Sequence, residues 1–215
     1  MTILSKIKKI IDYAKFGRFI IGGFNWDGKN DRLRPLHFPC EMVNFNDMIQ
    51  YATALTGDII SFSGNGYAQN NTSIEYINLP KCTSLGNWAA FRGCQVLKEC
   101  HLPSLVSLDQ EWLCQCSNLE ILEVGSLTYF KSQYAMKGNP KLHTFIIGKG
   151  TADSLFLQEC PLLTQECLHN IIDNVVDRKG GLALTLTVHQ DAYDRISEEY
   201  KTKLSNKNWN LAIGK

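Results

Sequence analysis

Aliphatic residues recur along this chain at a nearly constant interval, each of them three residues after an asparagine or a cysteine. The pattern occurs in five copies between residues 71 and 163, and consecutive copies begin 21 to 23 residues apart. The asparagine or cysteine positions are Asn71, Cys94, Cys116, Asn139 and Cys160. A period of about 20 to 50 residues that holds through several copies is the signature of a solenoid. We therefore predict a stack of coils, with one coil for each copy.

Each copy also predicts one short strand. Apolar residues occupy the aliphatic position itself and the positions three and five residues later, as in Leu97, Cys100 and Leu102. Because side chains alternate between the two faces of a strand, the positions two and four residues later face outward. Those outward positions are Tyr76, Asn78, Glu99, His101, Ile121, Glu123, Thr144 and Ile146. Stacking sets them in two columns on the concave face of a parallel sheet, which we take as the candidate recognition face.

The segments that return from one strand to the next carry their own apolar positions, such as Leu105, Leu108 and Leu113 before Cys116. They are too short for a long helix, so we expect turns, short 3₁₀ pieces or irregular arcs on the convex side. The asparagine or cysteine at the end of each arc is expected to bond backbone groups that the turn leaves unpaired, forming a structural ladder.

Two degenerate copies are predicted upstream of residue 71. Residues 33–39 reproduce the strand spacing and its final proline, and residues 57–62 do so more weakly, with Gly57 at the aliphatic position. Between Phe62 and Leu79 the interval shrinks to 17 residues, which indicates a shortened coil.

Apolar residues at helical spacing over residues 3–14 predict an amphipathic helix. The expected organisation is an N-terminal helix and cap (1–32), the repeats (33–163, best from 71) and a C-terminal cap (164–215).

The C-terminal segment departs from the repeat and predicts a helix, a strand, a second helix and a last strand. A helical apolar pattern runs from Leu168 to Val176 and is expected to stop at Gly180 and Gly181. Alternation over residues 182–188 predicts a strand, and residues 209–213 predict another. Either Asp191 or Ser197 is expected to cap the second helix.

The stretch from Gly86 to Pro103 resembles a known repeat. Its residues Phe91, Cys94, Leu97, Cys100, Leu102 and Pro103 match the pattern I-G-x-x-A-F-x-x-C-x-x-L-x-x-I-x-I-P. That pattern belongs to the BspA-like (Treponema-type) leucine-rich repeats of bacterial surface proteins. The resemblance covers residues 71–163, with departures at Leu113, Gly125, Met136 and Asn139.

This resemblance implies an α/β, β-rich solenoid: a right-handed leucine-rich-repeat superhelix with a parallel concave sheet, short convex arcs and an α+β C-terminal cap. It implies no catalytic residue. Members of this family are mostly described as adhesins or host-interaction proteins of microbes, and some occur in phages.

Charge and hydropathy exclude several classes of partner. The chain has 22 Lys and Arg against 21 Asp and Glu, for a net charge of +1. Such a balance gives no support to a nucleic-acid partner or an anionic membrane. No apolar run is long enough to span a bilayer. The N-terminus shows no export signal, so we expect a cytoplasmic or virion-associated protein, with surface exposure only by a non-standard route.

Eight cysteines raise the questions of disulfides and metal. Three lie on the ladder positions and Cys100 faces inward, so we expect structural free thiols, with disulfides and a metal site as the alternatives. The paired C-x-x-C spacing of a zinc site is missing, and no cofactor motif occurs.

Cys100 and His101 point to opposite faces, which argues against a nucleophile pair. The sequons at Asn70 and Asn71 are taken as chance matches. We expect no enzyme activity, no metal and no cofactor.

The leading hypothesis is a non-enzymatic recognition protein that presents its concave face to a protein or glycan, in adhesion or host interaction. The simpler alternative is that these outward residues are an ordinary exposed sheet surface. A hypothesis of another class is a phage virion or assembly component that packs against copies of itself or other subunits.

Overall fold

The computed structural model describes residues 68–86, 89–108, 111–130 and 134–214, together with six short strands between residues 20 and 62. Those strands are β1 (Ile20–Ile21), β2 (Phe24–Trp26), β3 (Arg32–Pro35), β4 (Val43–Asn44), β5 (Ala54–Thr56) and β6 (Ser61–Phe62). The helix predicted over residues 3–14 lies outside the described residues.

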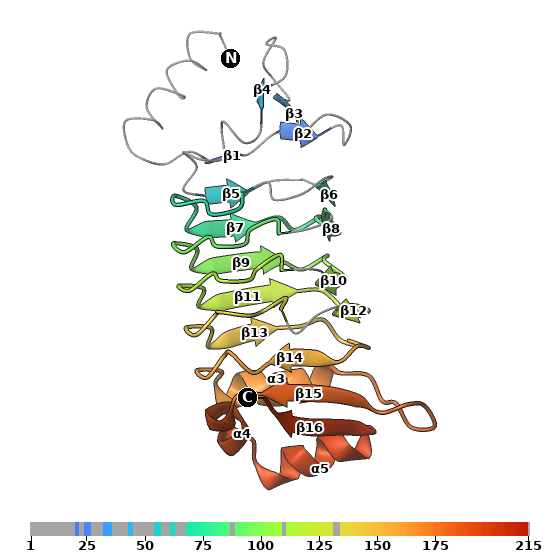
Figure 1. Cartoon of the computed structure of the whole chain (residues 1–215). Coiled ribbons are helices and arrows are strands. Elements are labelled where there is room, and N and C mark those ends of the chain that lie inside the picture. Colours follow the sequence, from blue (N-terminus) through green and yellow to red (C-terminus); the bar gives the residue numbers. More distant parts are fainter. Residues whose placement is uncertain are drawn as a thin grey trace.

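A six-stranded parallel sheet runs along one side of a stack of coils (Figure 1). We call it sheet A, and its strand order is β1-β5-β7-β9-β11-β13. Its later strands are β7 (Tyr76–Asn78), β9 (Glu99–Leu102), β11 (Ile121–Val124) and β13 (Thr144–Ile146). From β5 onward each coil contributes one strand, and every pairing in the sheet is parallel. The chain therefore has an α/β repeat fold whose strand register follows the period of the sequence.

The return segments are turns that contain strands of two residues, where we expected turns and 3₁₀ pieces. β8 (Ser84–Leu85) pairs with β6, and β10 (Ser107–Leu108) pairs with β12 (Tyr129–Phe130), in both cases parallel. No 3₁₀ helix occurs among the residues that the structure describes. Coils stacked at strand spacing, about 4.8 Å, bring the backbones of neighbouring arcs within hydrogen-bond distance, which favours short ladders over isolated helical turns.

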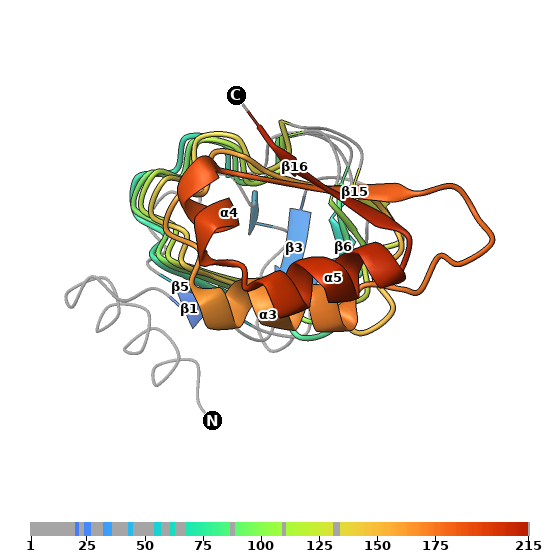
Figure 2. The same cartoon turned by 90° about the horizontal axis from the view of Figure 1, so that it is seen from below.

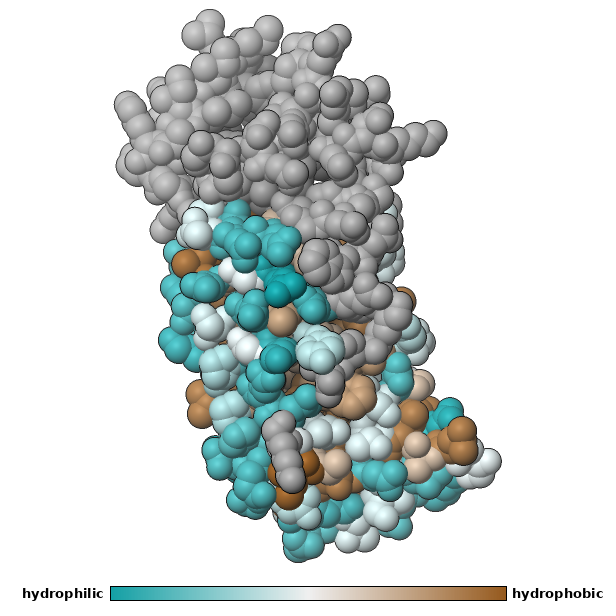
Figure 3. All heavy atoms as spheres, in the orientation of Figure 1, coloured by the Kyte–Doolittle hydropathy of each residue, from teal (hydrophilic) through white to brown (hydrophobic). Residues whose placement is uncertain are grey.

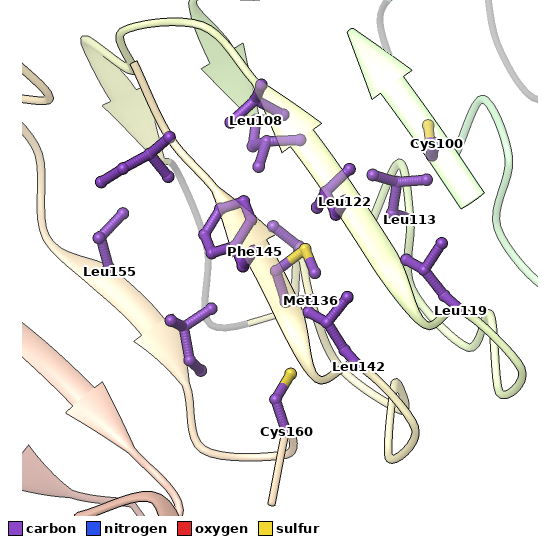
Figure 4. Packing of buried hydrophobic residues seen from close by; sticks show 14 of the residues in the cluster. Cys100, Leu108, Leu113, Leu119, Leu122, Met136, Leu142, Phe145, Leu155 and Cys160 are labelled. Atoms are coloured by element: carbon purple, nitrogen blue, oxygen red, sulfur yellow. The ribbon is translucent and has the colours of Figure 1, made fainter. Parts of the chain in front are cut away.

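One continuous core fills the interior of the stack. Inward side chains from sheet A meet those from the arcs, and Figure 4 shows Leu122 and Phe145 among Leu113, Met136 and Leu155. Leu113 and Met136, which depart from the phenylalanine of the resembled repeat, are both essentially fully buried. Both therefore serve as core residues in the phenylalanine position.

The asparagine and cysteine positions bond backward across the stack. The bonds run from Cys94 Sγ to Ala68 O (3.0 Å), from Cys116 Sγ to Phe91 O (3.2 Å) and from Asn139 Nδ2 to Leu113 O (2.9 Å). Asn71 instead accepts from the amides of Ser73 and Ile74 in its own turn. The Cys160 thiol is buried, and no hydrogen bond is seen for it within the described part of the chain. Ala68 O and Phe91 O also accept a backbone amide in their own turns, so the two thiols add a second bond to them, whereas Asn139 bonds a carbonyl for which no backbone partner is seen in the described residues.

The residue before each of the first four ladder positions has a left-handed backbone. These residues are Asn70 (φ 59°), Gly93 (φ 72°), Gln115 (φ 61°) and Gly138 (φ 75°). Glycine and a residue with a side chain alternate in this column. A Cβ at Gly93 would lie 2.2 Å from Asn70 Oδ1, and one at Gly138 would lie 3.2 Å from Gln115 Cα. The side chains of one coil thus occupy the space above the glycine of the next.

The upstream copy predicted at residues 33–39 is wrong. Leu33 lies in β3, which pairs antiparallel with both β2 and β4. This segment therefore forms a separate three-stranded sheet and adds no coil to sheet A. The first strand of sheet A is β1, which lies within the segment that we assigned to the N-terminal cap.

The second upstream copy is wrong in its register. Residues 54–56 provide the sheet A strand, with Leu55 opposite Ile77, and residues 61–62 lie in the arc as β6. Since Ala54 pairs with Tyr76, the coil has a regular length of 22 residues and is not shortened. The sequence pattern missed it because the aliphatic position falls on Ala52, and Ile49 stands where an asparagine or cysteine is usual.

The C-terminal segment contains three helices and two strands. In chain order these are α3 (Gln165–Asn174), β15 (Leu184–Val188), α4 (Gln190–Arg195), α5 (Glu198–Asn206) and β16 (Trp209–Ile213). β15 and β16 extend a parallel sheet that begins at β14 (Leu155–Leu157). Viewed along the stack, α3 and α5 lie side by side, and β15 and β16 lie on the opposite side (Figure 2).

Two details of this segment differ from the prediction. α3 ends at Asn174, well before Gly180, because Val175 is extended and forms a bridge with Thr151. The second helix is in fact two helices, α4 and α5, separated at Ile196. His189 caps α4 and Ser197 caps α5, so the proposed cap at Asp191 is wrong.

α3 covers the last strand of sheet A. Cys167 Sγ accepts from Phe145 N (3.1 Å) and donates to Phe145 O (3.4 Å), while Asn174 Nδ2 donates to Ile147 O (3.1 Å). Lys207 in turn donates to the carbonyl oxygens of Ile172, Asp173 and Val175 at the end of α3. Desolvation lowers the pKa of Lys207 despite the nearby carboxylate of Asp173. The edge strand therefore has its exposed backbone groups bonded by side chains, which prevents further strand addition there.

Candidate functional site

The eight outward residues predicted from the sequence lie in two columns on the outer face of sheet A. The parallel register sets Tyr76, Glu99, Ile121 and Thr144 in one row of neighbours. It sets Asn78, His101, Glu123 and Ile146 in the other. All eight are partly or largely exposed, and the residues between them in each strand are buried. In the described part of the chain, no element packs over these columns, since α3 contacts sheet A at its β13 edge.

His101 is the centre of the polar half of this face. Its Nδ1 lies 2.9 Å from Glu123 Oε2 and its Nε2 lies 3.4 Å from Glu99 Oε2. The ring of Tyr76 is tilted against the imidazole, with centroids 5.7 Å apart. When both ring nitrogens carry protons, each donates to a carboxylate, so the cluster fixes the directions of two acidic side chains.

The other half of the face is more apolar. Ile121 lies beside Glu99, and Ile146 lies beside Glu123, in each case one strand further along. Ile146, the last residue of β13, is 40% exposed. Thr144 is held by His143, whose Nδ1 lies 2.9 Å from the threonine hydroxyl. The face thus changes from acidic and aromatic to aliphatic along the stack.

A third column, which our sequence analysis did not include, borders the face. It consists of the residues directly after each aliphatic position, namely Glu75, Lys98, Glu120 and His143. Lys98 Nζ lies 2.9 Å from Glu75 Oε2, and this hydrogen bond raises the pKa of Lys98, with a further contribution from the charge of Glu120. The residue directly after the aliphatic position is polar in all four copies, and this regularity could have identified the third column from the sequence.

The cysteines that the structure describes are buried and do not reach the outer face of sheet A. Burial raises the pKa of Cys82 and of Cys94 to about 12, and it raises the pKa of Cys100 and Cys116 strongly. The seven cysteines that the structure describes are free and buried. A thiol that stays protonated in an apolar interior is a poor nucleophile and a poor metal ligand.

A hollow that no sequence pattern indicated lies between α3 and α5. Its lining residues are Gln165, Glu166, His169, Asn170, Asp173 and Tyr200. The rings of His169 and Tyr200 are stacked with centroids 3.6 Å apart, and Lys203 Nζ lies over the Tyr200 ring. One face of the Tyr200 ring is therefore covered by His169, and a charged ammonium group lies near the ring, which disfavours an apolar or sugar ligand there.

Within the described ranges, no group of three or more His, Cys, Asp or Glu side chains is arranged to hold a metal ion. Among the helices that the structure describes, none is long and apolar enough to cross a membrane. On the side of the molecule seen in Figure 3, apolar residues of the described part are scattered over the repeats and are more frequent on the C-terminal segment.

No protein-family model matches the chain, and no curated protein matches it. Among solved structures, the chain is similar to internalin C2 from Listeria monocytogenes, with 19% sequence identity, 80% of each chain covered and a TM-score of 0.42.

Proposed function

We propose that the chain is a leucine-rich-repeat solenoid that recognises a partner protein through the outer face of sheet A, without catalysing a reaction. The observation that carries this proposal is the alignment of the eight outward side chains in two columns. The strands beneath them are fixed by parallel hydrogen bonding and by inward residues such as Ile77, Cys100 and Leu122, which are fully buried. A rigid surface loses little conformational entropy when a partner binds.

A protein partner is favoured over a glycan by the chemistry of the face. Sugar sites need an exposed aromatic ring on which a sugar can stack, and Tyr76, the one aromatic residue in the two columns, is tilted against His101. The aliphatic half at Ile121 and Ile146 suits apolar side chains of a protein. Binding in adhesion or host interaction, as the resembled family suggests, is compatible with this surface.

Photo-cross-linking tests this proposal. A photoreactive phenylalanine analogue placed at Asn78, on the outer face of sheet A, is expected to cross-link a partner protein from its native environment. The same analogue at Ser107 on β10 is the matched control, because Ser107 is also a partly exposed strand residue but lies in an arc. Equal cross-linking at both positions, or cross-linking at Ser107 alone, would contradict the proposed face, and capture of a glycan would correct the class of partner.

A second candidate function is a subunit of an assembly. It is favoured by β16, which ends its sheet with no strand on its far side in the described structure and exposes Ile213. An edge strand without charge, proline or bulge is a template for pairing with another chain. Light scattering at increasing protein concentration distinguishes the two candidates, because an assembly subunit is expected to form oligomers and a pure recognition protein is expected to stay monomeric.

A further inference from the structure

Two carboxylates on the outer face of sheet A, those of Glu99 and Glu123, share a single partner, the imidazole of His101. Glu99 and Glu123 each use one oxygen, Oε2, to contact His101. In the part of the chain that the structure describes, neither pairs with a lysine or an arginine. The second oxygen of each carboxylate is therefore available as an acceptor for a group that approaches from outside.

The whole face carries excess negative charge, although the chain as a whole has a net charge of +1. Over the two columns and the bordering column, four carboxylates (Glu75, Glu99, Glu120 and Glu123) oppose one ammonium group, that of Lys98. That lysine is already bound to Glu75. Even if both histidines of these columns are counted as cations, four carboxylates oppose three positive groups, so the face attracts cations and repels nucleic acid and anionic lipid.

Each of the two central carboxylates has an isoleucine as its neighbour on the following strand. Glu99 pairs in register with Ile121, and Glu123 pairs with Ile146. The rungs are about 4.8 Å apart, so one extended side chain can contact both acidic residues while the next contacts both isoleucines. A partner that fits this face must combine a cation with an adjacent apolar group.

We propose that the outer face of sheet A binds a protein segment that places an arginine over His101, against the second carboxylate oxygens of Glu99 and Glu123, and an aliphatic side chain over Ile121 and Ile146. This proposal rests on the proposed function and specifies its partner. Arginine suits the site better than lysine because its planar guanidinium has several N–H donors, which reach two carboxylates at once.

Fluorescence anisotropy with short labelled peptides tests the proposal directly. The peptides carry one arginine followed at varied distance by a leucine, and companion peptides replace the arginine with lysine, glutamine or glutamate. We expect the arginine peptides to bind best, the glutamate peptides not to bind, and added salt to weaken binding. In E99Q/E123Q the affinity for the arginine peptides is expected to fall about tenfold or more.

The matched control is E166Q/E199Q, which removes the same charge from exposed positions of α3 and α5. It is expected to retain the wild-type affinity. An equal loss in both double variants would mean that only net charge matters, and equal binding of arginine and glutamate peptides would exclude a cation site. Absence of binding by every peptide at concentrations up to about 1 mM would also overturn the proposal.

The two proposals fail in different ways. If cross-linking at Asn78 captures a partner whose contact segment is acidic or neutral, the recognition role of sheet A stands and the arginine site is wrong. If the arginine peptides bind as expected but cross-linking favours Ser107, the site exists and the main recognition surface lies elsewhere.

Discussion

One side chain satisfies both outward backbone groups of Phe145: the Cys167 sulfur lies 3.1 Å from its amide nitrogen and 3.4 Å from its carbonyl oxygen. Phe145 is in β13, the last strand of sheet A, and Cys167 is in the first turn of α3. This contact replaces the hydrogen bonds that a further strand would make. It thereby ends the sheet without leaving an edge that pairs with other chains.

We predict that Cys167→Ala destabilises the protein by about 1–3 kcal/mol, because it leaves a buried amide and a carbonyl without partners. Urea unfolding measures the loss. Cys160→Ala is the matched control, since it removes a thiol that is also buried but makes no hydrogen bond in the described structure. Equal losses for the two variants would show that the Cys167 bonds contribute nothing beyond packing.

Asn139 is predicted to be the most sensitive position of the ladder. Its side chain donates to Leu113 O and Met136 O and accepts from Cys116 N, and it is fully buried. Asn139→Ala leaves three buried backbone groups unpaired, so we expect a loss of about 3 kcal/mol or more in the free energy of unfolding. Asn118→Ala, at a half-exposed site of the neighbouring turn, should cost less than about 1 kcal/mol. A small effect at Asn139 would contradict the structural role of the ladder.

Gly125 is predicted to tolerate no side chain, although the resembled repeat has proline there. A Cβ at Gly125 would lie 2.7 Å from Leu105 O and 2.8 Å from Pro103 O. The backbone amide of Gly125 also donates a hydrogen bond to Leu105 O. We expect Gly125→Ala and Gly125→Pro each to destabilise the chain by about 2 kcal/mol or more. Thermal unfolding of Gly150→Ala provides the comparison, because Gly150 has a positive φ but open space around it. A Gly125→Pro variant as stable as wild type would show that the coils can separate there.

Stability is predicted to fall at alkaline pH because of the buried thiols. Burial raises the pKa of Cys94 to about 12 and that of Cys167 to about 11, from an ordinary value of 9.0. A folded-state pKa above the unfolded one gives stability that is complete below pH 9 and is lost as the pH rises toward 11 to 12. In that window, each such thiol lowers the free energy of unfolding by about 1.4 kcal/mol per pH unit.

Urea unfolding at several pH values between 7 and 11 tests this slope. Cys94→Ser removes one titrating group and should make the decline shallower by the contribution of one thiol. An unchanged slope in Cys94→Ser would mean that the thiol ionises as readily in the folded chain as in the unfolded one.

The sequence predicted the strand register of β7, β9, β11 and β13 because their inward positions must be apolar to fill a shared core. It failed at β5, where Ala52 replaces the aliphatic residue and only the backbone pairing with β7 defines the coil. It also failed at α4 and α5, because the spacing of Tyr193, Ile196, Tyr200 and Leu204 suits one continuous helix. In the structure Ile196 is a buried residue after the end of α4, and Ser197 caps α5.

At the candidate site, the alternation of strand residues was enough to name the two columns, but it carried no information about contacts between strands. The bonds of His101 to Glu99 and Glu123 depend on which strands are neighbours and on side-chain rotamers. The hollow beside Tyr200 depends on packing between α3 and α5, whose residues are about 30 positions apart, and no local pattern encodes it.

Binding of the partner to the outer face of sheet A is tested by comparing the affinities of two charge variants. Ile146→Glu adds a charge to that face, and Val106→Glu adds the same charge at a similarly exposed aliphatic residue next to β10. Isothermal titration with the partner captured by cross-linking is predicted to show a loss of about tenfold or more for Ile146→Glu and wild-type affinity for Val106→Glu. Wild-type affinity in Ile146→Glu, with or without a loss in Val106→Glu, would contradict binding to this face.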